Sequence, residues 1–221
     1  MKTKKILVMR HGESKEDVDN NIYAEIRDFN IPLTNLGKEQ VNYAFLELQE
    51  EIKREKSLLI SSPSVRVRQS ALILKSKLHN RVVEFRKDPR LVKQNWGIVT
   101  HDNRKMYEEE RYKVGVLKYK FPNGESGYEV LYRVGNFVND LKSELSKSSH
   151  FQNVIIVAHG FIFRGIIMQM LQWSEDYFMK LANPPHCYIA KITLKDNLFV
   201  LDNHVPMYDA EKNKNHVSMV K

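Results

Sequence analysis

The 221-residue sequence has a single cysteine, Cys187, and lacks any long apolar run. One cysteine excludes an intramolecular disulfide and fits a reducing compartment, so we expect a cytoplasmic protein. No stretch reaches the roughly 18 apolar residues that would predict a membrane-spanning helix. Only the short run Ile6–Met9 separates the basic residues 1–5 from Arg10, and it is too short for the core of a signal peptide. We therefore expect no membrane association.

Motifs for nucleic acids and metals are also missing. Lys and Arg give a formal net charge of +8, but they are spread along the chain, with no Arg/Gly-rich segment or aromatic RNA-binding motif. We expect no nucleic-acid binding. The positive net charge would, however, attract an anionic small molecule. No residues have the spacing of a metal site, so we expect no metal and no other cofactor. The oligomeric state stays open.

The sequence does contain an alternation of strand-like and helical segments. Short apolar runs predict strands, and apolar residues at spacings of three and four predict helices. The predicted strands span residues 4–9, 57–61, 82–85 and 153–158, followed by a hairpin over 188–201. The predicted helices are 35–54 with Thr34 as N-cap, one opened by Pro63, 126–147, 160–172 and 174–182. This alternation predicts an α/β fold with a mostly parallel sheet.

We expect one domain over residues 1–221, because no repeat or linker interrupts the pattern. Residues 87–125 show no sheet pattern and hold a charged helix-like stretch at 107–112. Insertions of this kind often cover an active site, so this one is expected to be a lid or specificity element. Residues 10–32 read as polar and irregular. The charged tail from about residue 208 is expected to fray.

Two predicted strands end in the same dipeptide, His-Gly. One apolar run stops at Arg10-His11-Gly12, and the other stops at His159-Gly160. Open α/β sheets bind ligands at the carboxyl ends of their strands, so both imidazoles are expected at one site. Gly160 leads into a helix, whose first N–H groups favour an anion.

A third strand end adds arginines. Arg66 and Arg68 follow residues 57–61, and since they lie two apart on a helix, at most one readily faces the same pocket. The planar fork of arginine suits phosphate oxygens, and an imidazole in the right tautomer can attack phosphorus to form a phosphohistidine. These residues together predict a cationic phosphoryl pocket.

The motifs resemble the histidine phosphatase superfamily, also called the phosphoglycerate mutase-like family. Residues 10–14 (Arg-His-Gly-Glu-Ser) match its signature, and Ser62-Pro63 followed by Arg66 and Gln69 looks like its second motif. His159-Gly160 looks like its last. The resemblance implies a three-layer sandwich and no metal. It also implies that His11 is the nucleophile and that the phosphoryl group is bound by Arg10, Arg66 and His159. Further substrate contacts are expected from Ser14, Asp17, Lys93 and Gly160.

The sequence departs from the family pattern at two positions. The family commonly places its proton-donating glutamate in a segment Arg-Leu-x-Glu-x-x-aromatic-Gly, but residues 90–97 carry Lys93 there. Many relatives have an asparagine that touches phosphate where this chain has Asp17. General acid catalysis contributes about 10²–10⁴-fold, so its loss would slow turnover and leave phosphate binding intact.

Three interpretations of these departures stay open. Asp17 or Glu125 serves as the acid, Lys93 binds a second anionic group of the substrate, or the protein is a weak or inactive relative. The opposite charges of Asp17 and Lys93 also permit an ion pair between them, and the plainest alternative places both at the pocket rim, facing water.

The expected function is hydrolysis of a small phosphorylated substrate by a phosphomonoesterase, through a phosphohistidine on His11 and at a reduced rate. The alternatives are a catalytically impaired relative that binds phosphate or phosphopeptides, or a phosphoglycerate mutase. A phosphatase is favoured over a mutase because a mutase needs the acid for both directions of transfer.

Overall fold

A computed structural model describes residues 4–208, without the side chains of residues 20, 24, 101 and 102. The tail that was expected to fray from about residue 208 lies almost wholly outside this range. Six strands form one sheet in the order β3-β2-β4-β1-β5-β6. They are β1 (Lys4–Arg10), β2 (Ser57–Ser61), β3 (Val82–Lys87), β4 (Asn153–Ala158), β5 (Ile189–Lys195) and β6 (Leu198–Leu201). The strands β1 to β4 run parallel, whereas β5 is antiparallel to both β1 and β6.

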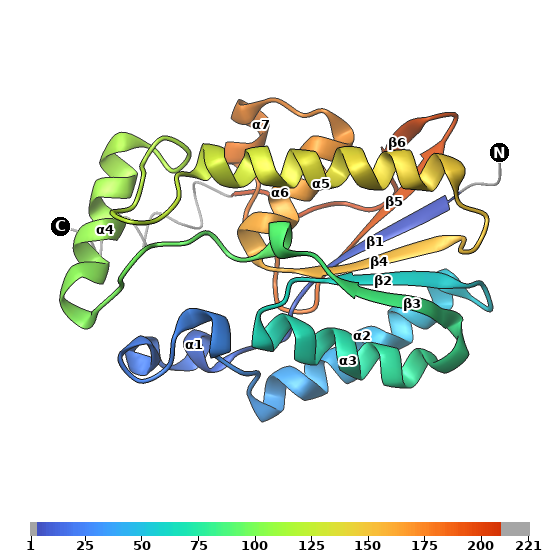
Figure 1. Cartoon of the computed structure of the whole chain (residues 1–221), viewed down its shortest axis with the longest axis horizontal. Coiled ribbons are helices and arrows are strands. Elements are labelled where there is room, and N and C mark those ends of the chain that lie inside the picture. The colour runs from blue at the N-terminus through green and yellow to red at the C-terminus, as the bar shows by residue number, and fades with distance from the viewer. Residues whose placement is uncertain (1–3, 209–221) are drawn as a thin grey trace.

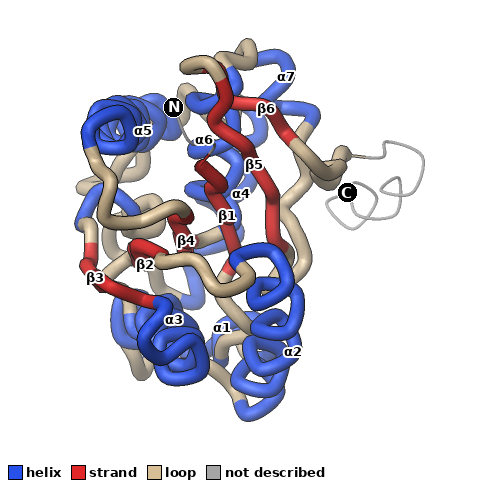
Figure 2. Tube along the Cα trace, turned by 90° about the vertical axis from the view of Figure 1, so that its right-hand side faces the viewer, coloured by secondary structure: helices blue, strands red, loops and turns tan. Residues whose placement is uncertain are grey.

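Helices cover both faces of this sheet, as the two views in Figures 1 and 2 show. One face is covered by α2 (Asn35–Ile52) and α3 (Val65–Leu78), and the other by α5 (Gly127–Lys147) and α6 (Gly160–Leu171). The predicted α/β three-layer sandwich with a mostly parallel sheet is confirmed. The remaining helices are α1 (Lys15–Val18), α4 (His101–Val114), α7 (Glu175–Lys180) and the 3₁₀ turns η1 (Asn20–Ala24), η2 (Asp28–Asn30), η3 (His79–Arg81) and η4 (Pro89–Leu91).

The middle positions of the central strands are apolar because both faces of these strands are buried. Successive side chains of a strand point to opposite faces. Leu7 and Met9 of β1 therefore pack with the α2 and α3 side chains, while Ile6 and Val8 pack with those of α5 and α6. A continuous apolar run that ends abruptly in polar residues is the expected pattern for such a strand.

Local signals account for several element ends. The Thr34 hydroxyl accepts a hydrogen bond from Gly37 N (2.9 Å), which confirms the predicted N-cap of α2. Asp196 and Asn197, with φ of 50° and 63°, form the turn of the predicted β5–β6 hairpin. The helix assigned to Pro63 begins later, at Val65, and α7 is shorter than predicted. Residues 10–32, expected to be irregular, contain α1, η1 and η2.

The carboxyl ends of β1, β2 and β4 meet at one edge of the sheet, where α1 and α4 also lie (Figure 1). Backbone hydrogen bonds continue past the strands at this edge. His11 N donates to Ala158 O (3.0 Å), and Ser62 N donates to Val157 O (3.2 Å). The backbone itself thus fixes the relative positions of the residues that follow these strands.

The turn after β1 packs directly on the first turn of α2. A Cβ atom added to Gly37 would lie 1.9 Å from Glu13 O, and one added to Gly12 would lie 2.3 Å from Gly37 O. These contacts leave room only for glycine at both positions, and they hold the His11 loop against α2.

Replacing Gly37 with alanine should destabilise the fold, although alanine is the better helix former. We expect Gly37→Ala to cost about 1–3 kcal/mol of unfolding free energy, the usual range for overpacking. Gly135 of α5 is the control, because its added Cβ would have only the Gln169 side chain as its nearest neighbour, at 3.4 Å. Gly135→Ala should be neutral or stabilise by up to about 1 kcal/mol. Urea unfolding measures the stability of both variants. Equal changes in their unfolding free energy would contradict the close contact between Gly37 and Glu13.

Candidate active site

His11 lies at the end of β1 with its ring buried and its tautomer fixed. Its Nδ1 lies 2.7 Å from Gly12 O, and because a carbonyl only accepts, Nδ1 must carry the proton. Burial, reinforced by the charges of Arg66 and Arg10, holds the pKa of His11 well below its usual value. At neutral pH the ring is therefore uncharged, with the lone pair on Nε2. This is the state that a nucleophilic imidazole requires.

His159 follows β4 and is the N-cap residue of α6. Its ring centroid lies 5.3 Å from that of His11, at an interplanar angle of 72°. His159 Nε2 lies 3.2 Å from the Ser62 hydroxyl at the end of β2, whereas His159 Nδ1 is buried without a hydrogen-bond partner in the described part of the chain. Burial and the charge of Arg66 also hold the pKa of His159 well below its usual value. The two imidazoles predicted to share one site do so.

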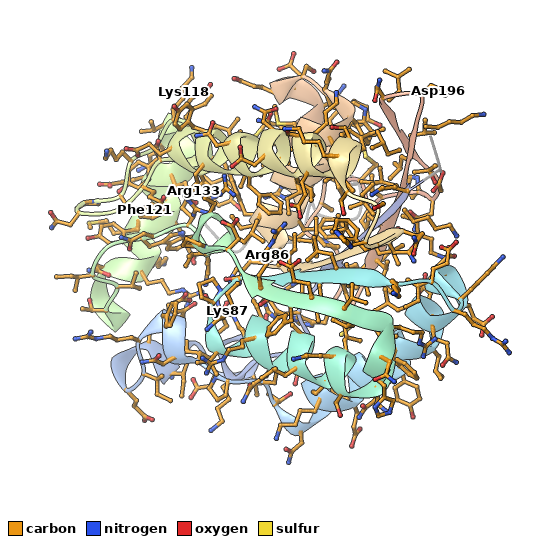
Figure 3. All side chains as sticks on the ribbon, turned by 45° about the vertical axis from the view of Figure 1, so that its right-hand side comes forward. Arg86, Lys87, Lys118, Phe121, Arg133 and Asp196 are labelled. Atoms are coloured by element: carbon orange, nitrogen blue, oxygen red, sulfur yellow. The ribbon has the colours of Figure 1, made fainter. Side chains whose placement is uncertain are left out.

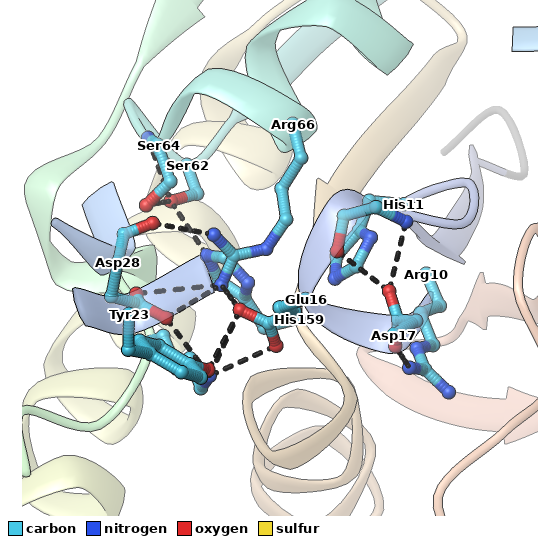
Figure 4. A network of polar contacts seen from close by, with 12 residues as sticks. Arg10, His11, Glu16, Asp17, Tyr23, Asp28, Ser62, Ser64, Arg66 and His159 are labelled. Carbon is cyan, nitrogen blue, oxygen red and sulfur yellow. Dashed lines mark hydrogen bonds and ion pairs between the residues drawn. The ribbon is translucent and has the colours of Figure 1, made fainter. Parts of the chain in front are cut away.

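Arg66 is completely buried, and two acidic residues share its guanidinium (Figure 4). Nη1 donates to Asp28 O (2.7 Å), while Nη2 lies 3.2 Å from the Asp28 carboxylate and 3.1 Å from that of Glu16. The Arg66 Nε atom is buried with no partner among the described residues. A phosphoryl group that binds Arg66 can take this Nε donor, but it must compete with the two carboxylates for Nη2.

Lys93 belongs to the same cluster. Its Nζ donates to Glu16 (3.0 Å), to Asp28 (2.9 Å) and to the Tyr23 hydroxyl (2.8 Å). Burial alone lowers the pKa of the Lys93 ammonium, but Asp28 and Glu16 outweigh it and raise the pKa above its usual value. Lys93 does not pair with Asp17, and with its side chain only 25% exposed it does not simply face water. For Lys93, therefore, neither of these two alternatives holds.

Asp17 lies on the other side of the pocket, with Arg10 and His186. Its Oδ1 lies 3.2 Å from Arg10 Nη2 and 3.1 Å from His186 Nε2, and its Oδ2 accepts from the Ser14 hydroxyl (2.6 Å) and from Ser14 N (2.8 Å). Burial alone raises the pKa of Asp17, but hydrogen bonds from His186 and Ser14 outweigh it and hold the pKa well below its usual range. Asp17 is thus ionised and oriented by these partners, in an exposed position at the rim, with its side chain 19% exposed. Arg10 is fixed further by Nη1, which donates to Pro184 O (2.7 Å).

Glu125 lies in a separate cluster. Its carboxylate accepts from Arg133 Nε (2.9 Å) and Nη2 (3.0 Å) and from Asn95 N (2.9 Å). Figure 3 shows Arg133 on α5 and Phe121 in the adjoining insertion. Arg133 Nη2 also donates to Val92 O (2.8 Å), so Arg133 and Glu125 together hold residues 92–95 against α5. None of these contacts joins Glu125 to His11, Arg66 or His159.

The structure therefore gathers one group of predicted residues at a single sheet edge. It consists of Arg10, His11, Ser14, Asp17, Arg66, Lys93, His159 and Gly160. The sequence analysis missed four residues that contact this group, namely Glu16, Tyr23, Asp28 and His186. Glu16 could have been suspected from its place beside the signature. The others come from segments without periodicity, and nothing in the sequence singled them out.

A cavity of about 680 Å³ opens beside the Lys93 cluster. One wall is formed by residues 92–99 and Arg104 of the insertion, and the other by Tyr23 and residues 27–29. Lys93, Asp28 and Tyr23 line the cavity and also contact Glu16 or Arg66, so they separate it from the buried guanidinium. The cavity is partly apolar, through Phe29, Trp96 and Ile98, and cationic through Arg27 and Arg104.

Within residues 4–208, no group of three or more His, Cys, Asp or Glu side chains has a geometry that could hold a metal ion. In the same range, no helix combines the length and apolar character needed to cross a bilayer.

Comparison with known proteins places these observations in a family. The histidine phosphatase superfamily (branch 1) matches residues 6–205. Two phosphoglycerate mutase-like proteins of Arabidopsis thaliana, AT74H and AT74, are 28% and 30% identical to the chain over 85% and 86% of its length. The chain spans 73% and 65% of these relatives. A mycobacterial glucosyl-3-phosphoglycerate phosphatase, solved with VO₃, is 19% identical with a TM-score of 0.73, over 92% of this chain and 99% of its own.

The cluster of Arg66, Lys93, Glu16 and Asp28 predicts a specific pH dependence of stability. Burial alone raises the pKa of Asp28, but Lys93 and Arg66 outweigh it and hold the pKa well below its usual range. The unfolded value is about 3.9, so the stabilisation is complete above it and is lost as the pH falls through the folded value. Asp28→Asn should cost about 1–3 kcal/mol at pH 7, and its difference from the native protein should shrink as the pH falls from about 5 to 2.

Urea unfolding across this pH range measures the effect. Asp140, whose side chain is 73% exposed, supplies the control, and Asp140→Asn should change stability by less than about 0.5 kcal/mol. A loss in Asp28→Asn that stays constant with pH would contradict the assigned role of the ionised carboxylate.

Proposed function

The chain belongs to the histidine phosphatase superfamily, and we propose that it is a phosphomonoesterase that hydrolyses a small phosphorylated substrate through a phosphohistidine on His11. The observation that carries this proposal is the state of His11. It is buried and neutral, its Nδ1–H is held by Gly12 O, and its Nε2 lone pair is left to attack phosphorus.

Arg10 and Arg66 flank this nucleophile as fixed positive charges. In phosphoryl transfer, catalysis comes mainly from positioning and from electrostatic stabilisation of the transferring oxygens. A phosphoryl group beside His11 would take hydrogen bonds from the Arg66 guanidinium in exchange for Glu16 and Asp28. It would also satisfy His159, whose Nδ1 is buried and unpaired among the described residues. Ser14 contributes by holding Asp17, and Gly160 contributes the first backbone N–H of α6.

A second candidate function is phosphate binding without turnover. It is favoured by the two carboxylates that occupy the Arg66 guanidinium and by the position of Lys93, which binds them in place of a proton-donating glutamate. Hydrolysis of an aryl phosphate distinguishes the two functions. Such an ester has a good leaving group, so its hydrolysis depends little on a general acid. A phosphoglycerate mutase is less well supported, since it needs an acid in both directions of transfer.

We propose residues 87–125 as the element that selects the leaving group. The support is the cavity, one wall of which comes from residues 92–99 and Arg104. Its apolar and cationic lining suits a leaving group with an apolar part and a negative charge. Lys93 itself is hydrogen-bonded to Glu16 and Asp28, which argues against its binding a second anionic group of the substrate.

Removing the nucleophile should abolish turnover. Nitrophenyl phosphate hydrolysis by His11→Asn should fall by at least about 10³-fold, and acid-labile phosphate trapped on the native protein should be absent from the variant. His150 is exposed and distant from the site, so His150→Asn should keep full activity. A native protein that folds and binds inorganic phosphate but hydrolyses no nitrophenyl phosphate would instead support the binding function.

A negative charge on the cavity wall should weaken substrate binding selectively. Ile98 lines the cavity and is 72% exposed, so aspartate there is tolerated sterically. Ile98→Asp should raise KM for nitrophenyl phosphate about two- to fivefold with little change in kcat, because charge pairs near a surface are worth on the order of 1 kcal/mol. Leu198→Asp, at the 69% exposed start of β6, is the matched control. Equal KM values for the two variants would count against the cavity as the substrate site.

A further inference from the structure

The carboxylates around the pocket are all engaged as hydrogen-bond acceptors or in ion pairs. Glu16 accepts from Lys93 and the Tyr23 hydroxyl and pairs with Arg66, and Asp28 accepts from Lys93 and Arg66. Asp17 accepts from Ser14 and Arg10. The pKa values of Asp17 and Asp28 both lie below their usual range, so both stay ionised at neutral pH. A leaving alkoxide must obtain its proton elsewhere.

Two other proton carriers near the pocket are also unsuited. The pKa of Lys93 is raised by Asp28 and Glu16 against the effect of burial. Burial is the largest effect on Tyr23 and raises the pKa of its hydroxyl to about 12, and the hydroxyl proton is donated to Glu16. A general acid works best with a pKa near the operating pH, which neither group has.

Another titratable group beside the nucleophile, within the described part of the chain, is His186, on the loop between α7 and β5. The loop is anchored beside the nucleophile by its backbone. Pro184 O accepts from Arg10 Nη1, and Cys187 N donates to the carbonyl oxygens of Arg10 (3.1 Å) and His11 (3.3 Å). The ring centroid of His186 consequently lies 5.9 Å from that of His11, and its side chain is 21% exposed.

The His186 ring is held by one nitrogen. Nε2 lies 3.1 Å from Asp17 Oδ1 and 3.0 Å from Arg10 Nη2. Because a guanidinium only donates, Nε2 accepts from Arg10 when it carries no proton, and it pairs with Asp17 instead when it is protonated. The hydrogen bonds that His186 makes within the described residues all involve Nε2, which leaves Nδ1 for another partner. A carboxylate that binds one imidazole nitrogen and so orients the other is a common device of acid–base catalysis.

We propose that His186, oriented by Asp17, is the general acid and base of the phosphatase reaction, in the role that position 93 does not fill. This proposal rests on the proposed function. In the first step the His11 Nε2 lone pair bonds to phosphorus, and the electron pair of the breaking P–O bond goes to the leaving oxygen. That oxygen takes the proton from Nδ1 of the His186 imidazolium, whose N–H bonding pair stays on the ring.

The second step reverses the roles. Nδ1 of the neutral His186 takes a proton from water as the water oxygen bonds to phosphorus, and the P–N pair returns to His11. The ester and water become alcohol and phosphate, and His186 ends protonated as it began. The proposal also gives Asp17 a purpose, because an asparagine there could not compensate the charge of an imidazolium beside Arg10.

The test is the dependence of rate on the leaving group. Ethyl phosphate needs a proton on its leaving oxygen, whereas nitrophenyl phosphate largely does not. In His186→Asn, kcat/KM for ethyl phosphate should fall by about 10²–10⁴-fold, and that for nitrophenyl phosphate by less than about tenfold. The asparagine oxygen can still accept from Arg10, and urea unfolding checks that the variant folds. His150→Asn should leave both rates unchanged.

Other outcomes overturn the proposal. Equal losses for both esters would make His186 a positioning residue for Arg10, and unchanged rates would leave it without a catalytic role. A native protein that hydrolyses nitrophenyl phosphate but not ethyl phosphate would have no working acid. Hydrolysis of neither ester would instead remove the proposed function itself.

Discussion

The charge of Arg66 has to be balanced inside the protein, because its guanidinium has no access to water. An unpaired buried charge is strongly destabilising, so the surrounding chain must supply anions. It does so with Glu16 from α1 and Asp28 from η2. This pairing holds residues 10–32 against the edge of the sheet. The end of that segment is held by Gln69, on the same helix as Arg66, whose side chain accepts a hydrogen bond from Leu33 N (2.8 Å). The shape of the pocket follows from one buried cation.

The two departures from the family pattern become intelligible as parts of this charge arrangement. A glutamate at position 93 would stand against Glu16 and Asp28, and the lysine found there binds both. Asp17 in place of an asparagine would repel phosphate if it were isolated, but it is compensated by Arg10 and hydrogen-bonded by Ser14 and His186. The charges have changed together, so neither position can be interpreted from its own side chain.

Much of the fold could be predicted from the sequence because its signals are local. The strands that precede His11 and His159 have apolar runs, residues 6–9 and 154–158, that are buried on both faces, and Thr34 caps its helix through its own hydroxyl. The arginine and histidine members of the pocket could be predicted as neighbours because parallel strands end at one edge. The partners Asp28, Tyr23 and His186 could not, since they come from turns and loops that carry no periodic pattern.

The sheet, the strand ends and the cationic character of the site around His11 could be predicted from the sequence alone. Only the tertiary structure decided which acid faces which cation. It assigned Lys93 to Glu16 and Asp28, Asp17 to Arg10 and His186, and Glu125 to Arg133. Ion pairing depends on how closely the folded chain brings charged side chains together, and no pattern along the chain records those distances.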